Sequence, residues 1–105
     1  MDILKSDWQL FRAKLPEWQE AYMEKLINEY ASLLNENKPA SEKFWELESH
    51  IKKDKHKPGV IIEMRKSEMV NNIIDLLNDN VISLDDLSDF SEELKETVNS
   101  FLHRF

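Results

Sequence analysis

Only one arrangement in this chain resembles a metal site: two carboxylates and an imidazole at Glu46, His50 and Asp54. Their four-residue spacing would place all three side chains on one face of a helix. Carboxylate and imidazole groups can bind zinc or iron. The same spacing is typical of a solvated stripe, here beside Lys53 and Lys57, and we adopt that interpretation. We therefore predict no metal site.

Sequence motifs of common enzyme active sites are absent, including the nucleophile elbow, the P-loop, the dinucleotide fingerprint and the zinc-protease motif. The chain has no cysteine, which excludes thiolate ligands and cysteine nucleophiles. Its single glycine argues against a phosphate-cradling loop. Carboxylates are plentiful, but glycosidase chemistry needs two of them across a cleft, which a small helical domain rarely builds. We predict a non-enzymatic protein with no catalytic residues and no cofactor.

A basic cluster, defined here as the cations between residues 52 and 66, could contact nucleic-acid phosphates. The alternative is a solvated helix end, where the helix dipole favours cations. The sequence pI of about 4.9 argues against a nucleic-acid partner, so binding through Lys52–Lys66 stays an alternative. The cluster consists of Lys52, Lys53, Lys55, Lys57, Arg65 and Lys66.

The acidic residues are unevenly distributed. Residues 1–66 hold 12 acids and 12 bases, whereas residues 67–101 hold nine acids and one base, Lys95. A field of one sign steers charged partners and says little about fold. We therefore predict that the densest acids form a contact face for a protein partner with a basic surface. These residues are Asp85, Asp86, Asp89, Glu92, Glu93 and Glu96.

The predicted function is that of a small acidic interaction or regulatory module. The acids would raise the association rate toward a basic partner more than the affinity. A sharper alternative is a nucleic-acid mimic of the anti-restriction or anti-CRISPR type, which inhibits a nuclease or DNA-binding protein. A further alternative is a homo-oligomer joined through the apolar C-terminal helix.

The composition predicts one small, soluble helical domain spanning residues 1–105. One glycine in 105 residues favours few, long elements over a turn-rich sheet. The segment MDILKSDWQLF has an early acid and no long apolar run, so we expect no signal peptide. Apolar runs are far shorter than the roughly 20 residues of a membrane span. We expect a cytoplasmic protein with no membrane association.

The first half of the chain predicts three helices. Ser6 opens a capping-box pattern for a short first helix. Pro16 suits the first turn of a second helix, which would run to Asn35 as the spine of the fold. A third helix would begin at Pro39 or at Ser41. Aromatic residues fall largely at helical spacing, so most of them are predicted to lie in the core. Phe44, Leu47 and Ile51 mark the expected buried face of the third helix, with Trp45 on its flank.

The second half predicts three more helices. Apolar spacing favours a helix over about 60–78, although residues 59–62 could instead be extended. Ser83 would cap a short helix with acids in its first turn. Asp89 or Ser91 would cap a last helix. Leu94, Val98, Phe101 and Phe105 fall at heptad-like spacing along it.

The segment from Asn72 to Leu87 reads as helix, polar break, Val-Ile, serine cap, acids and then an apolar residue. This run is similar to the helical hairpin of SHOCT-type oligomerisation modules. It differs by having Asn80 where those modules have glycine. The resemblance implies a helix–turn–helix hairpin. We therefore predict an all-α, small single-domain bundle of four to six helices. If the basic cluster neutralises the acids in this fold, the charge asymmetry is architectural; if the two stand apart, it indicates a binding surface.

Overall fold

A computed structural model describes residues 2–103. Every regular element in this range is helical, which confirms the predicted all-α fold of four to six helices. The α-helices are α1 (Lys5–Leu34), α2 (Ala40–Asp54), α3 (Met69–Asn78) and α4 (Glu92–Leu102). Two short 3₁₀ helices, η1 (Lys66–Glu68) and η2 (Leu84–Leu87), precede α3 and α4.

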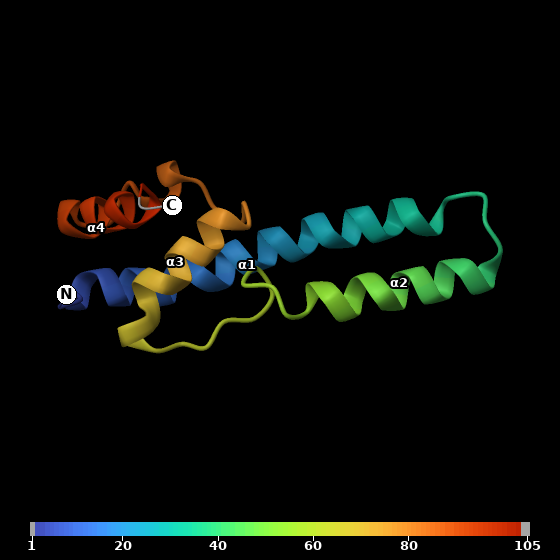
Figure 1. Cartoon of the computed structure of the whole chain (residues 1–105), viewed down its shortest axis with the longest axis horizontal. Helices are drawn as coiled ribbons and strands as arrows, with labels where there is room; N and C mark the ends of the chain where they lie inside the picture. Colours follow the sequence, from blue (N-terminus) through green and yellow to red (C-terminus); the bar gives the residue numbers. More distant parts are fainter. Residues whose placement is uncertain (1, 104–105) are drawn as a thin grey trace.

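The molecule is elongated, with extents of 53, 28 and 22 Å. Helix α1 runs along the long axis, and α2 returns beside its C-terminal half (Figure 1). We call this hairpin, residues 19–57, the arm. Helices α3 and α4 gather at the N-terminal half of α1. We call this part, residues 2–18 and 60–103, the head.

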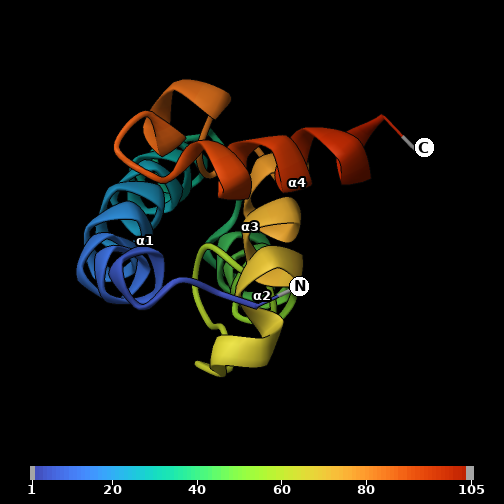
Figure 2. The ribbon, with the colours of Figure 1, turned by 90° about the vertical axis from the view of Figure 1, so that its left-hand side faces the viewer.

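The hydrophobic core lies in the head. Helix α3 packs against α4, which crosses one end of the molecule (Figure 2). Helices α1, α3 and α4 and the η2 region all contribute fully or nearly fully buried apolar side chains. The arm contributes none to this cluster. Its members are Phe11, Leu15, Met69, Ile73, Leu76, Ile82, Leu87, Phe90, Leu94 and Val98.

Helix α1 is continuous through Pro16, so the predicted division into two helices at this proline was wrong. Proline removes one backbone hydrogen bond, the one to the carbonyl of Arg12. Both Pro16 and Arg12 are exposed, so water can reach that carbonyl. Meanwhile Phe11 and Leu15 are anchored in the head core, on the other side of the helix. Packing therefore outweighs the local cost of proline.

The predicted capping box at Ser6 was also wrong. Helix α1 begins at Lys5 after Leu4, and no side chain caps it. The Asp7 side chain, which follows Ser6, is engaged with Ser91 at the start of α4. The first turn of α1 is therefore held by a tertiary contact of Asp7 and not by a local cap.

The helix predicted over 60–78 forms only from Met69, after the turn η1. Residues 61–65 have no regular structure, and no strand forms at 59–62. The chain turns here because the amides of Val60 and Ile61 both donate to the carbonyl of Lys57, each at 2.9 Å. Pro58 and Gly59 within this turn oppose a helix. The segment joins the arm to the head.

The turn after α3 confirms the predicted helical stop. Asn80 has φ 58°, the left-handed conformation that asparagine tolerates. The amide of Val81 donates to the carbonyl of Leu76 at 2.9 Å, and that of Asn80 to Leu77 at 3.1 Å. These two bonds form a Schellman motif, which satisfies the last carbonyls of α3. The following helix is the short η2.

Candidate functional site

The predicted contact residues lie on η2, in the linker after it and at the start of α4. All six side chains are exposed, so none is withdrawn into the core. We call this group the acidic face. It consists of Asp85, Asp86, Asp89, Glu92, Glu93 and Glu96.

Three members of the acidic face share one side of α4. At 100° per residue, Glu92, Glu93 and Glu96 fall within an arc of about 100°. Leu94 and Val98 occupy the opposite side and are fully buried. Burial of that side therefore fixes the three carboxylates toward solvent.

Local capping fixes the two helix starts on which most of the acidic face lies. Ser83 was predicted to cap η2, and the Asp86 carboxylate accepts a hydrogen bond from the backbone N–H of Ser83 at 2.8 Å. The reciprocal bond to the Ser83 side chain is also present, so the two residues form a capping box. Of the two predicted caps of α4, Asp89 and Ser91, the structure has Ser91, whose Oγ accepts from the amide of Leu94 at 3.1 Å. Both helix starts that carry these acids are thus fixed by serine caps.

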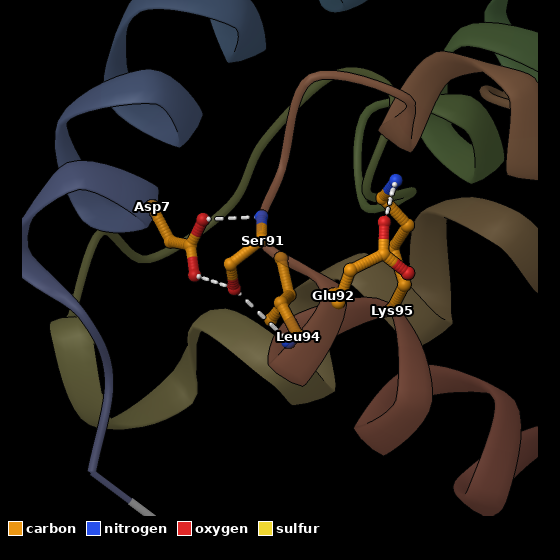
Figure 3. A network of polar contacts seen from close by, with 5 residues as sticks. All are labelled: Asp7, Ser91, Glu92, Leu94 and Lys95. Atoms are coloured by element: carbon orange, nitrogen blue, oxygen red, sulfur yellow. Dashed lines mark hydrogen bonds and ion pairs between the residues drawn. The ribbon is translucent and has the colours of Figure 1, made fainter.

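A buried carboxylate ties the acidic face to α1. Asp7, only 3% exposed, accepts from the backbone N–H of Ser91 at 2.9 Å and from its Oγ at 2.6 Å (Figure 3). The two residues are 84 positions apart in sequence. Ser91 thus links the start of α1 to the first turn of α4. This contact holds the acidic face in one orientation on the head.

The ion pairs within and around the acidic face are few. Asp89 lies 3.6 Å from the ammonium of Lys14, and Glu92 lies 2.9 Å from that of Lys95. No ion pair to Asp85, Glu93 or Glu96 occurs among residues 2–103. Asp86 has none within this range either, so four of the six acids keep their charge without an ion pair.

The basic cluster does not neutralise these acids. Its ion pairs are local: Lys57 contacts Asp54 at 3.3 Å, and Arg65 contacts Glu63 at 2.6 Å. Within the described range, no ion pair joins the cluster to any acid of residues 67–101. The cluster lies at the end of α2 and in the following segment up to η1, whereas the acidic face lies on η2 and α4. The charge asymmetry of the sequence therefore persists in the fold.

The other three acids of residues 67–101 lie elsewhere. Glu68 is in η1 and hydrogen-bonds Asn71, Asp75 is exposed on α3, and Asp79 follows the end of α3. One carboxylate oxygen of Asp79 is buried with no hydrogen-bond partner among the described residues. The acidic face therefore includes six of the nine acids of residues 67–101.

Glu46, His50 and Asp54 do not come together as a ligand set. In the part of the chain that is described, no group of three His, Cys, Asp or Glu residues could hold a metal ion. Glu46 pairs with Lys38 at 3.0 Å. Asp54 accepts a hydrogen bond from the Tyr30 hydroxyl at 2.5 Å and is nearly buried. The Tyr30–Asp54 hydrogen bond thus joins α1 to α2, whereas Glu46 joins α2 to the loop that precedes it.

The contact between Tyr30 and Asp54 shifts the pKa of both groups. Burial raises the pKa of Asp54, but hydrogen bonds from Tyr30 and Lys57 and the charge of Lys57 outweigh it, so the pKa lies below its ordinary value. Burial and the hydrogen bond to Asp54 raise the pKa of Tyr30. Hydrogen bonding to Asp54 also raises the pKa of Lys57. The pair therefore favours ionised Asp54 and neutral Tyr30.

We expect the arm to lose stability in acid. Asp54 has a lower pKa folded than unfolded, so its stabilisation is complete above the ordinary value of 3.8 and is lost as pH falls through the lower folded pKa. Urea unfolding between about pH 5 and pH 2 should show a steeper decline for wild type than for Asp54→Asn. Glu42→Gln, at an exposed site on the same helix, should keep the wild-type slope. Equal slopes in all three proteins would contradict this role of Asp54.

The arm carries a second surface that the sequence pattern misassigned. Phe44 and Ile51 were predicted to be buried, yet they are 63% and 44% exposed. Trp45, 64% exposed, packs edge-to-face on Phe44 with ring centroids 5.0 Å apart. The periodicity correctly identified an apolar face. It could not show that α3 and α4 pack against the other end of α1 and leave this face uncovered.

Comparisons with protein families, curated proteins and solved structures found no match to this chain. The fold and the site are therefore interpreted from their own geometry. Among the helices of residues 2–103, none is both long and apolar enough to cross a membrane.

Proposed function

We propose that this protein is a non-enzymatic binding module that docks a partner protein with a basic surface through the acidic face. One observation carries the proposal: the six carboxylates are exposed, and within the described residues none pairs with the basic cluster. The absence of enzyme motifs in the sequence supports a binding role. The cysteine-free composition fits a reducing compartment, so we place this contact in the cytoplasm.

The acidic face would act mainly on the rate of encounter. Exposed ion pairs contribute only about 0–1 kcal/mol each in water. A concentrated field of one sign, by contrast, raises the association rate toward an oppositely charged surface and weakens with salt. The serine caps and the Asp7 contact favour this use because they hold the carboxylates in fixed positions.

Affinity capture from source lysate tests the proposal with two charge-matched variants. The face variant combines Asp85→Asn, Glu93→Gln and Glu96→Gln, which leaves the caps and the two ion pairs intact. The control variant changes three exposed acids of α1, and both variants shift the net charge equally. Its substitutions are Glu17→Gln, Glu20→Gln and Glu24→Gln.

Wild type and the control variant should retain the same basic protein at low salt and release it at high salt. The face variant should retain several-fold less of it. Equal retention by all three proteins would contradict the proposal. Capture of a nuclease or DNA-binding protein, displaced by DNA, would identify the acidic face as a nucleic-acid mimic.

A further inference from the structure

The uncovered face of the arm is apolar across both of its helices. Two hollows open on it. One, of about 220 Å³, lies between α1 and α2 and includes Met23, Ile27, Tyr30 and Ile51 in its lining. The other, of about 340 Å³, runs along α2 beside Phe44, Leu47 and Ile51. They share Ile51 and Lys55, so they form one continuous surface.

The charges along α2 have a definite order. Residues 40–49 carry three acids and one base, whereas residues 50–57 carry four lysines and one acid. Some of these are already paired, Glu46 with Lys38 and Lys57 with Asp54. Among the charges free of ion pairs within residues 2–103, Glu48, Lys52 and Lys55 line the hollow along α2. Glu42 and Lys53 are also unpaired, but at about 100° per residue they lie on the side of the helix opposite Ile51.

We propose that a second copy of this chain covers the arm, with the two α2 helices antiparallel across a two-fold axis. This arrangement places Glu48 of each α2 near Lys52 and Lys55 of the other, and the two-fold symmetry repeats each contact. A parallel arrangement would oppose like charges. A helix from another protein would need bases opposite Glu48 and acids opposite Lys52 and Lys55. A second copy of α2, lying antiparallel, already has its charges in that order. Two arms packed in this way form a four-helix bundle.

The size of the face sets the expected strength of the dimer. The 15 residues of α2 span about 22 Å, and two adjacent helices are about 20 Å wide. This projects to on the order of 450 Å² per copy, below the roughly 800 Å² of a standard stable interface. Side chains that interdigitate in the two hollows add to that area. We therefore expect a reversible dimer that dissociates on dilution through the micromolar range.

Sedimentation equilibrium of the full chain over a concentration series tests the proposal. Wild type should show a monomer–dimer equilibrium. Ile51→Ser removes the side chain shared by both hollows and should weaken the dimer by about tenfold or more. Leu84→Ser, at an exposed apolar side chain of the head, is the matched control and should dimerise like wild type. Circular dichroism verifies that both variants remain helical.

A charge exchange tests the antiparallel order. Glu48→Lys and Lys52→Glu should each weaken the dimer. Each variant brings like charges together at both of the symmetry-related contacts between residues 48 and 52. The double variant should recover most of the wild-type association. A chain that stays monomeric at every concentration would overturn the proposal, as would a dimer insensitive to Ile51→Ser. A double variant as weak as the single variants would overturn the antiparallel arrangement.

Discussion

Asp7→Ala should lower the free energy of unfolding by about 3 kcal/mol. The carboxylate is buried and accepts two hydrogen bonds from Ser91, one from the backbone N–H and one from Oγ. Hydrogen bonds to a charged group contribute about 1.5–3 kcal/mol, and a buried donor left without a partner costs about 1–3 kcal/mol. Alanine removes both acceptors at once. Urea denaturation at neutral pH measures the change.

Two companion variants separate the parts of this network. Asp7→Asn keeps one side-chain oxygen and should fall between wild type and Asp7→Ala. Glu17→Ala, at an exposed site on the same helix, should stay within about 0.5 kcal/mol of wild type. If Asp7→Ala were as stable as the Glu17 control, the contact would not hold α1 to α4.

Gly59→Ala should destabilise the protein by about 2 kcal/mol. Gly59 is buried, and a Cβ added there would lie within 3.0 Å of three carbons of the Tyr22 ring. Overpacking of this kind typically costs about 1–3 kcal/mol. Alanine also restricts the unfolded chain more than glycine does, which offsets about 0.4–1 kcal/mol of this loss. The nearby hydrogen bond from Gln19 to the carbonyl of Pro58, 3.1 Å long, leaves the turn little room to move away.

A double-mutant cycle identifies the cause of this effect. In the background of Tyr22→Ala, the three atoms nearest the added methyl group are removed, so Gly59→Ala should cost much less than in wild type. Thermal or urea unfolding of the four proteins gives the coupling free energy. An equal cost in both backgrounds would show that the loss arises from the backbone of residue 59 and not from the Tyr22 ring.

Local signals in the second half of the sequence were read correctly where tertiary packing agrees with them. Ser91 caps α4 and Ser83 caps η2, because short polar side chains before an acidic turn satisfy free amides. Leu94 and Val98 are buried as their spacing predicts. Phe105, the last member of that pattern, lies outside the described residues. The helical fold follows from such local agreement.

The errors arise where distant contacts decide the local structure. Pro16 remains inside α1 because the head core holds the residues beside it. The predicted capping box at Ser6 does not form, and the neighbouring Asp7 instead contacts Ser91, 84 positions away, which no local pattern reveals. Gly59, the sole glycine, was read as a break between helices. The structure shows a further reason for glycine here: the ring of Tyr22, 37 positions away, leaves no room for a side chain.

For the candidate site, the sequence identified the charges but not their surroundings. It located the six acids, and the fold shows that they stay exposed and apart from the basic cluster. Leu94 and Val98, on which the homo-oligomer alternative depended, are buried in the head core. The exposed apolar face of the arm could not be foreseen, because periodicity reveals an apolar stripe but not whether anything covers it.

The most direct test of the acidic face is the association rate of the captured partner as a function of ionic strength. For wild type and the Glu17, Glu20 and Glu24 control, the rate should be high at low salt and fall steeply together as salt rises. For the Asp85, Glu93 and Glu96 variant, it should start about tenfold lower and depend weakly on salt. The same rate and the same salt dependence in all three proteins would contradict binding through the acidic face.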